Sequence, residues 1–106
     1  MPKYLLEASY TAEGTKGLLK EGASKRRATV EETLKTLGAR MEAFYYALGE
    51  HDVYLIVDAP DNVTVAAVSM AVNAAGAVHL KTTALLTTEE IDMAMKKSVN
   101  YRPPGK

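Results

Sequence analysis

The feature that most constrains the fold of this chain is a pair of strand-like runs separated by a very short connection. The runs cover residues 39–48 and 53–59 and are rich in Ala, Tyr, Leu and Val. Between them lies only Gly49-Glu50-His51-Asp52. A connection of this length and composition is typical of a β-hairpin. We therefore predict that the two runs pair as antiparallel strands.

Strand-like segments also stand near both ends of the chain. Residues 3–10 alternate larger apolar side chains on one side with Leu5, Glu7 and Ser9 on the other, which predicts a first strand. Residues 77–86 are rich in Val, Leu and Thr and predict a fourth strand. The hairpin thus lies between two outer strand segments in the sequence.

Caps and glycines place helices between these strands. Three glycines make residues 11–23 a broken helix at best, whereas residues 24–37 have helical periodicity that ends at Gly38. After the third strand, Asp61 is a good N-cap for a helix over residues 63–75. Each crossover between strands therefore contains a helix.

A last helix follows the fourth strand. Thr87 and Glu90 have the spacing of a capping box, which predicts a short helix from there to about Ser98. The two prolines of residues 99–106 cannot continue it, so we expect an extended tail.

The order of these elements predicts an α+β fold of the ferredoxin-like βαββαβ type. Such a fold has a four-stranded antiparallel sheet with helices on one face, here followed by the short C-terminal helix. The fourth strand is expected at an edge of the sheet. A length of 106 residues suits one domain, which we place at residues 1–98.

Both faces of the predicted sheet carry bulky apolar residues, although two helices can cover only one face. In the second strand, strict alternation sets Arg40, Glu42, Phe44, Tyr46 and Leu48 against Met41, Ala43, Tyr45 and Ala47, and in the third it sets Tyr54 and Ile56 against Val53, Leu55 and Val57. We expect a second copy of the sheet to cover the remaining face, giving a homodimer or a larger ring. A small domain that simply has an apolar surface is the alternative.

Composition excludes several classes of partner and site. Lys+Arg and Asp+Glu both number 13, so the formal net charge of +0 disfavours binding to nucleic acid by bulk electrostatics. With no Cys, the chain has no disulfide and no thiolate metal site, and its two His residues make no recognisable metal site with any carboxylate. The uncharged stretch 62–80 is diluted by polar residues, so we expect no membrane partner. The N-terminus does not look like a secretory signal, and a cytoplasmic protein without a cofactor is expected.

The hairpin segment resembles the signature of the GYD domain family. The residues concerned run Phe44-Tyr-Tyr-Ala-Leu-Gly-Glu-His-Asp-Val-Tyr-Leu-Ile-Val-Asp-Ala-Pro-Asp61, supported by Tyr4, Thr11-Ala-Glu-Gly14, Leu37-Gly38 and the threonines from Thr82 to Thr87. The resemblance spans roughly residues 3–95 and implies a fold and assembly like those of the dimeric α+β barrels. Where the family commonly has Gly-x-Tyr-Asp, this chain has Gly49-Glu50-His51-Asp52, so imidazole replaces the phenol.

One candidate site is the pair His79 and Lys81. Residues two apart on a strand project from one face about 7 Å apart. A lysine can hold an anionic or carbonyl oxygen, and a histidine can exchange a proton near neutral pH. This predicts a ligand site. The alternative is that the two polar residues protect an edge strand from unwanted pairing.

A second candidate lies in the hairpin, where His51 and Asp52 could form an oriented imidazole and carboxylate pair. In the alternative interpretation Gly49 takes a positive φ and Asp52 accepts hydrogen bonds from backbone N–H groups of the turn. Tyr45 and Tyr54 add phenols that can orient a planar aromatic ligand, or simply pack in a core or an interface.

Two classes of function follow. The first is a small oligomeric α+β module that binds a small molecule or only assembles. The second is a cofactor-free enzyme that performs proton transfer or oxygenation on a small aromatic or carbonyl compound. A closed cavity above about 300 Å³ with His79 or His51 pointing into it favours the enzyme. We favour the module, because the sequence lacks a convincing acid–base pair.

Overall fold

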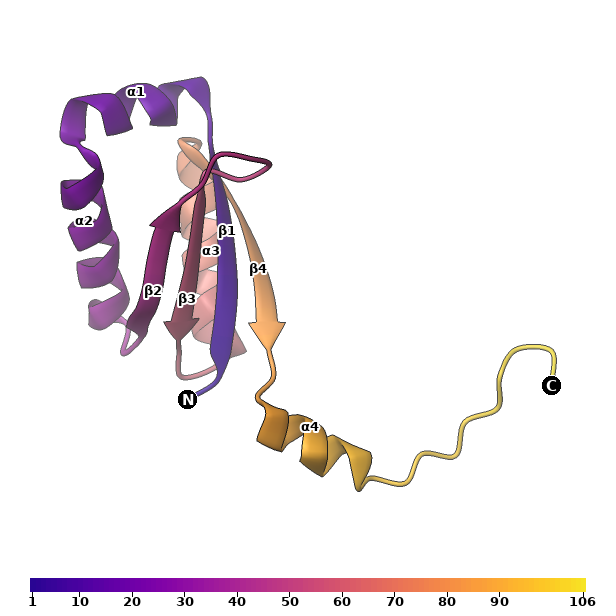
Figure 1. Cartoon of the computed structure of the whole chain (residues 1–106). Coiled ribbons are helices and arrows are strands. Elements are labelled where there is room, and N and C mark those ends of the chain that lie inside the picture. The colour runs from indigo at the N-terminus through magenta and orange to yellow at the C-terminus, as the bar shows by residue number, and fades with distance from the viewer.

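A computed structural model describes residues 1–106 and contains one antiparallel sheet in the strand order β2-β3-β1-β4. The strands are β1 (Lys3–Tyr10), β2 (Arg40–Tyr46), β3 (Val53–Asp58) and β4 (Val78–Leu85). β4 is an edge strand, as predicted. The α+β, ferredoxin-like fold class is therefore confirmed (Figure 1).

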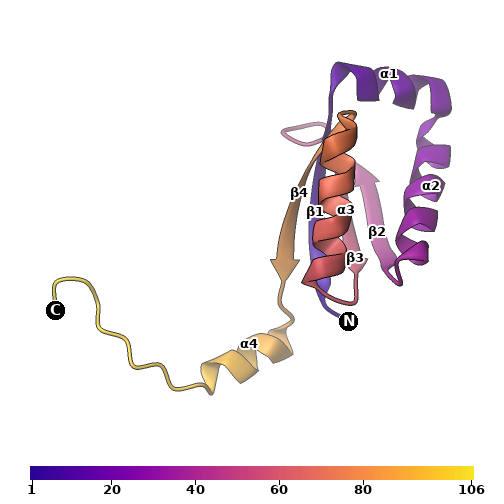
Figure 2. The same ribbon diagram turned by 180° about the vertical axis from the view of Figure 1, so that it is seen from behind.

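Two helices cover one face of this sheet. α2 (Ala23–Thr36) and α3 (Asn62–Ala75) lie on the same side of the strands, and Figure 2 shows α3 in front of the sheet with β4 beside it. α1 (Ala12–Glu21) crosses the end of the sheet between β1 and α2. The opposite face has no helix over it.

The stretch after β1 is better ordered than its glycines predict. α1 is a continuous helix capped by Thr11, whose hydroxyl accepts from the Gly14 N–H, so the prediction of a broken helix over residues 11–23 is wrong within α1. The break falls at Gly22, whose φ of 97° separates α1 from α2. Close packing requires glycine at position 14, because a Cβ there would lie 2.0 Å from the carbonyl oxygen of Ala77.

The strict alternation predicted for the second strand is also wrong. The pairing of β2 with β3 shifts register between Met41 and Ala43, which marks a β-bulge around Glu42. A bulge inserts one residue and resets which side chains point inward. Met41 and Phe44 are consequently both buried, although they have opposite parity in the sequence.

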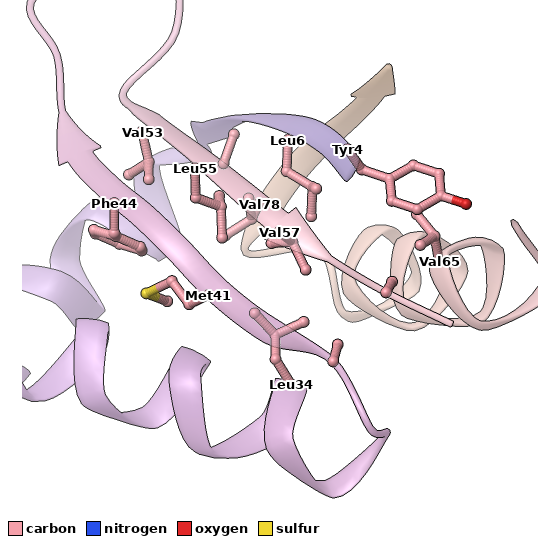
Figure 3. Close-up of a cluster of buried hydrophobic side chains, with 13 residues drawn as sticks. Tyr4, Leu6, Leu34, Met41, Phe44, Val53, Leu55, Val57, Val65 and Val78 are labelled. Carbon is pink, nitrogen blue, oxygen red and sulfur yellow. The ribbon is translucent and has the colours of Figure 1, made fainter. Parts of the chain in front are cut away.

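The hydrophobic core lies between the sheet and α2 and α3 (Figure 3). Its apolar side chains come from all four strands, from both helices and from the connections before β2 and after β3. The buried members are Tyr4, Leu6, Ala8, Leu34, Ala39, Met41, Phe44, Val53, Leu55, Val57, Ala59, Val65 and Val78. The structure thereby shows that Tyr4, Leu6 and Ala8 of β1 and Val53, Leu55 and Val57 of β3 face the helices.

Part of the free edge of β4 is closed by α3. The side-chain amide of Asn73 donates to the Leu80 carbonyl oxygen at 3.2 Å, and its oxygen accepts from the Leu80 N–H at 2.7 Å. An unpaired strand edge invites pairing with another chain. Asn73 therefore satisfies both backbone groups of Leu80 from within the same chain.

The last helix projects away from this body. α4 (Thr88–Met95) begins with the predicted capping box of Thr87 and Glu90 but ends three residues earlier than predicted. It and the tail extend away from the sheet, and the chain spans 57 × 33 × 24 Å (Figures 1 and 2). None of the helices is long and apolar enough to cross a membrane.

Candidate functional site

The uncovered side of the sheet, here called the open face, is a two-dimensional array set by strand register. Its central residues are Leu5, Glu7 and Ser9 on β1, next to Ile56 and Tyr54 on β3. β4 adds the partners of the β1 residues, with Thr83 opposite Leu5, Lys81 opposite Glu7 and His79 opposite Ser9. Figure 1 views the sheet from this side, with α3 behind the strands.

His51 from the hairpin joins two residues of this array. Its Nδ1 lies 3.0 Å from Ser9 Oγ, and its Nε2 lies 3.3 Å from Glu7 Oε2. The side chains of His51 and Glu7 are both only 15% exposed. Tyr54 packs against the imidazole with a ring-centroid distance of 5.7 Å. Glu7 and Ser9 thus hold His51 in one orientation.

The His51–Asp52 pair considered from the sequence does not form. Asp52 Oδ2 instead accepts from the Tyr10 N–H at 2.8 Å, and the Asp52 N–H donates to the Ala8 carbonyl oxygen. The Asp52 carboxylate therefore accepts from β1 rather than from an N–H group of the hairpin, and it ties the hairpin to β1. Gly49 has no positive φ, so that part of the alternative interpretation is wrong.

A group of charges occupies the other end of the open face. Asp58 is 4% exposed and accepts from Lys3 Nζ and from Arg40 Nη2, both at 2.8 Å. Lys3 Nζ also lies 2.6 Å from Glu42 Oε2. The hydrogen bonds from Lys3 and then Arg40 lower the pKa of Asp58, because they favour its charged form. The same bonds to Asp58 raise the pKa of Lys3 and of Arg40.

The predicted ligand residues all lie on or beside the open face, but they do not form one compact group. His79 and Lys81 are exposed, and neither makes a side-chain hydrogen bond or ion pair within the chain. Tyr45 is 72% exposed and stands opposite Tyr54 in the sheet register. Tyr54 packs against His51 of the hairpin, and the role of His79, Lys81, Tyr45 and Tyr54 as ligand residues stays a prediction.

Sequence reasoning placed Glu7 and Ser9 on one side of the first strand but did not connect them to His51. The signal was present in their alternation with Leu6 and Ala8, since residues two apart share a face. What was missing was the approach of the hairpin, which lies more than forty residues away in the chain.

A cavity of about 210 Å³ lies on the other side of the sheet, between the strands, α2 and α3. Its walls are mainly apolar and include Leu6, Val30, Phe44, Leu55, Val72 and Leu80. Tyr10, Arg26, Thr29 and Thr33 are its polar lining residues. Neither histidine lines it, so the condition that favours the enzyme class is not met.

Tyr46 lies beside the polar part of this cavity lining. Its hydroxyl donates to the Ala23 carbonyl oxygen at 3.0 Å. Burial raises the pKa of Tyr46 above its usual range, and the neighbouring Tyr10 raises it further. The phenol therefore stays protonated and continues to donate at neutral pH.

The fold and the open sheet face together define a small α+β protein of the ferredoxin-like kind. The sequence model of the GYD domain matches residues 4–95. Because this match covers most of the chain, the protein belongs to the GYD domain family. A search of curated proteins and a search of solved structures each returned no match.

Proposed function

We propose that this protein is a small oligomeric module that binds a compact, mainly apolar molecule in the cavity between sheet and helices. The observation that carries the proposal is the lining of that cavity, which is apolar apart from a few grouped polar residues. Ligand sites combine apolar walls with a small number of polar groups that orient the ligand.

The size and charge of the cavity indicate the class of ligand. An apolar cavity of about 150 Å³ suffices for benzene, so 210 Å³ takes a single ring or a short chain. Arg26 is the charged residue of the lining, and a guanidinium favours a carboxylate. A small aromatic or short-chain carboxylate therefore fits best.

Titration with benzoate and with benzene tests this assignment, with the melting temperature and calorimetric affinity as readouts. Benzoate should stabilise the parent, Val72→Trp should abolish binding by filling the cavity, and Arg26→Gln should weaken benzoate about tenfold while sparing benzene. Lys25→Gln removes the same charge from a residue outside the cavity and serves as the control. Absence of binding to the parent, or equal binding by all variants, contradicts the proposal.

The assembly that we propose pairs the open faces of two copies. Leu5 and Ile56 are half-buried apolar residues at the centre of this face, and Tyr45 is exposed beside them. Charges of both signs surround this centre, and such a pattern can complement itself across a two-fold axis. The packing excludes water from the apolar centre in the same way as a core does.

Light scattering decides this assembly. The expected mass is at least twice the 11.5 kDa of one chain at micromolar concentration, and a monomer contradicts the proposal. Tyr45→Asp should lower the mass, because it places an unpaired charge in the open-face contact. Leu19→Asp makes a comparable change at an exposed apolar residue of α1 and should leave the mass unchanged.

A second candidate function rests on the Ser9–His51–Glu7 arrangement. A carboxylate at Nε2 favours the imidazole tautomer that carries its proton there, so Nδ1 accepts from the Ser9 hydroxyl and can act as a base when that hydroxyl turns away. The chemistry would be cofactor-free proton abstraction next to the carbonyl of a small compound at the open face.

Exchange of the methyl hydrogens of pyruvate in deuterated water, followed by nuclear magnetic resonance, tests the enzyme candidate. The parent should accelerate the exchange, and His51→Ala should remove the acceleration. Asp52→Asn is the matched control, because Asp52 binds backbone and does not contact His51 in the hydrogen-bond network. No acceleration by the parent excludes pyruvate as a substrate and favours the module.

A further inference from the structure

The outer face of α3 is apolar although it is exposed to solvent in the single chain. The sequence of α3 contains no charged residue, and its inner side packs on the sheet through Val65, Val68 and Val72. The exposed apolar residues recur at spacings of three and four, which is the pattern of a second buried helix face. They are Val63, Ala66, Ala67, Met70, Ala71 and Ala74.

α4 has the complementary property of a helix without any partner. None of its residues is buried, and it packs against no other element of the chain. Ile91 and Met95 lie one turn apart on the same side of α4, with Ala94 beside them. The charged residues of α4, which are Glu89, Glu90 and Asp92, lie about 100° or more around the helix axis from Ile91. The strip formed by Ile91 and Met95 can therefore dock while Asp92, three residues before Met95, stays at the rim of the contact.

α4 cannot reach the outer face of α3 in its own chain. Only Leu86 and Thr87 connect β4 to α4, and two extended residues span about 7 Å. α3 stands between the sheet and that face, and a helix with its side chains is about 10–12 Å across. Thr87 also fixes the start of α4 through its capping box. Figures 1 and 2 show the helix leading away from the body.

We propose that α4 of a second copy packs along the outer face of α3. The same chain carries both surfaces, so a symmetric exchange between two copies forms the α4–α3 contact two times. The alanines of α3 let another helix approach closely, and Ile91 and Met95 supply the bulk that fills the groove between turns. The family match ends at Met95, so it includes all of α4 within the domain. This contact lies on the opposite side of the sheet from the open face and is independent of the packing proposed there.

Sedimentation of the full-length chain over a range of concentrations tests the exchange. Met95→Glu and Met70→Glu each place a charge in the contact and should weaken association about tenfold or more. Met93→Glu makes the same change on the other side of α4 and should change association less than about twofold. All three substitutions are at exposed positions, and circular dichroism verifies that the variants fold.

Crosslinking distinguishes docking of α4 on a second copy from docking of α4 on α3 of its own chain. The chain has no Cys, so the double variant Met70→Cys/Met95→Cys can be treated with a short bismaleimide. Exchange predicts a product of twice 11.5 kDa, whereas docking of α4 on its own α3 predicts a product of single mass and overturns the proposal.

Two further results also bear on the proposal. Unchanged association in both Met95→Glu and Met70→Glu overturns it, as does an effect of Met93→Glu equal to that of Met95→Glu. If only the open-face packing is wrong, Tyr45→Asp leaves the association unchanged while Met95→Glu still weakens it.

Discussion

The two faces of the sheet are stabilised in different ways, even where their residues are neighbours in the chain. On the covered face, Leu55 and Val57 are buried among apolar side chains from α2, α3 and the other strands. On the open face, Ile56 is half-buried, and the strands around it are tied by particular polar pairs. A substitution on the covered face therefore changes the free energy of unfolding mainly through the volume of the side chain. On the open face the change comes mainly from charge and hydrogen bonding.

The largest expected effect comes from truncating neighbouring residues of β3. Leu55→Ala should lower the free energy of unfolding by about 3 kcal/mol, because it leaves a cavity in a packed core. Ile56→Ala should cost about 1 kcal/mol in the monomer, since Ile56 is only partly covered. Urea unfolding at low protein concentration measures both.

The same pair of variants sharpens the comparison when the concentration is raised. If a second copy covers the open face, the cost of Ile56→Ala should grow with concentration toward that of Leu55→Ala. A constant difference across the concentration range contradicts coverage of this face, and equal costs at low concentration contradict the distinction between the two faces.

Asp58 provides the next largest effect and a dependence on pH. Asp58→Asn should lower stability at pH 7 by about 2 kcal/mol, the scale of hydrogen bonds to a charged group. Because folding lowers the pKa of Asp58 below its unfolded value of about 3.9, its contribution is full above that value and is lost as pH falls through the folded pKa.

Unfolding of the parent and of Asp58→Asn between pH 7 and pH 2 therefore tests the ion pairs of the open face. The two stabilities should converge as the solution becomes acidic. A gap that stays constant down to pH 2 would show that the Lys3 and Arg40 contacts do not stabilise the charged carboxylate.

A smaller effect is expected in the hairpin. Asp52→Asn should lower stability by about 1 kcal/mol, because it removes the charge from the acceptor of the Tyr10 N–H. Affinity for benzoate should not change, since Asp52 does not line the cavity. A loss of affinity with stability intact would contradict the structural role of this residue.

The smallest effect should come from Ser9→Ala. Its hydroxyl makes one hydrogen bond with His51, in a half-buried position, so we expect a loss of about 0.5 kcal/mol. Thermal unfolding of this variant beside Glu7→Gln shows which of the two contacts holds His51. A loss above about 2 kcal/mol for Ser9→Ala would mean that the open face depends on this residue as strongly as on Asp58.

The sequence by itself determined the order of the elements, the hairpin at residues 49–52, the caps at Asp61 and Thr87, and the alternation of side chains along β1 and β3. These features depend on local periodicity and on hydrogen bonds within a few residues, so they can be found along the chain. Only the tertiary structure decided the bulge around Glu42, the contact of His51 with Glu7 and Ser9, and the cavity beside Arg26. Each of these depends on how distant segments pack against one another, and strand register and helix placement are set by the sum of many contacts that no short pattern contains.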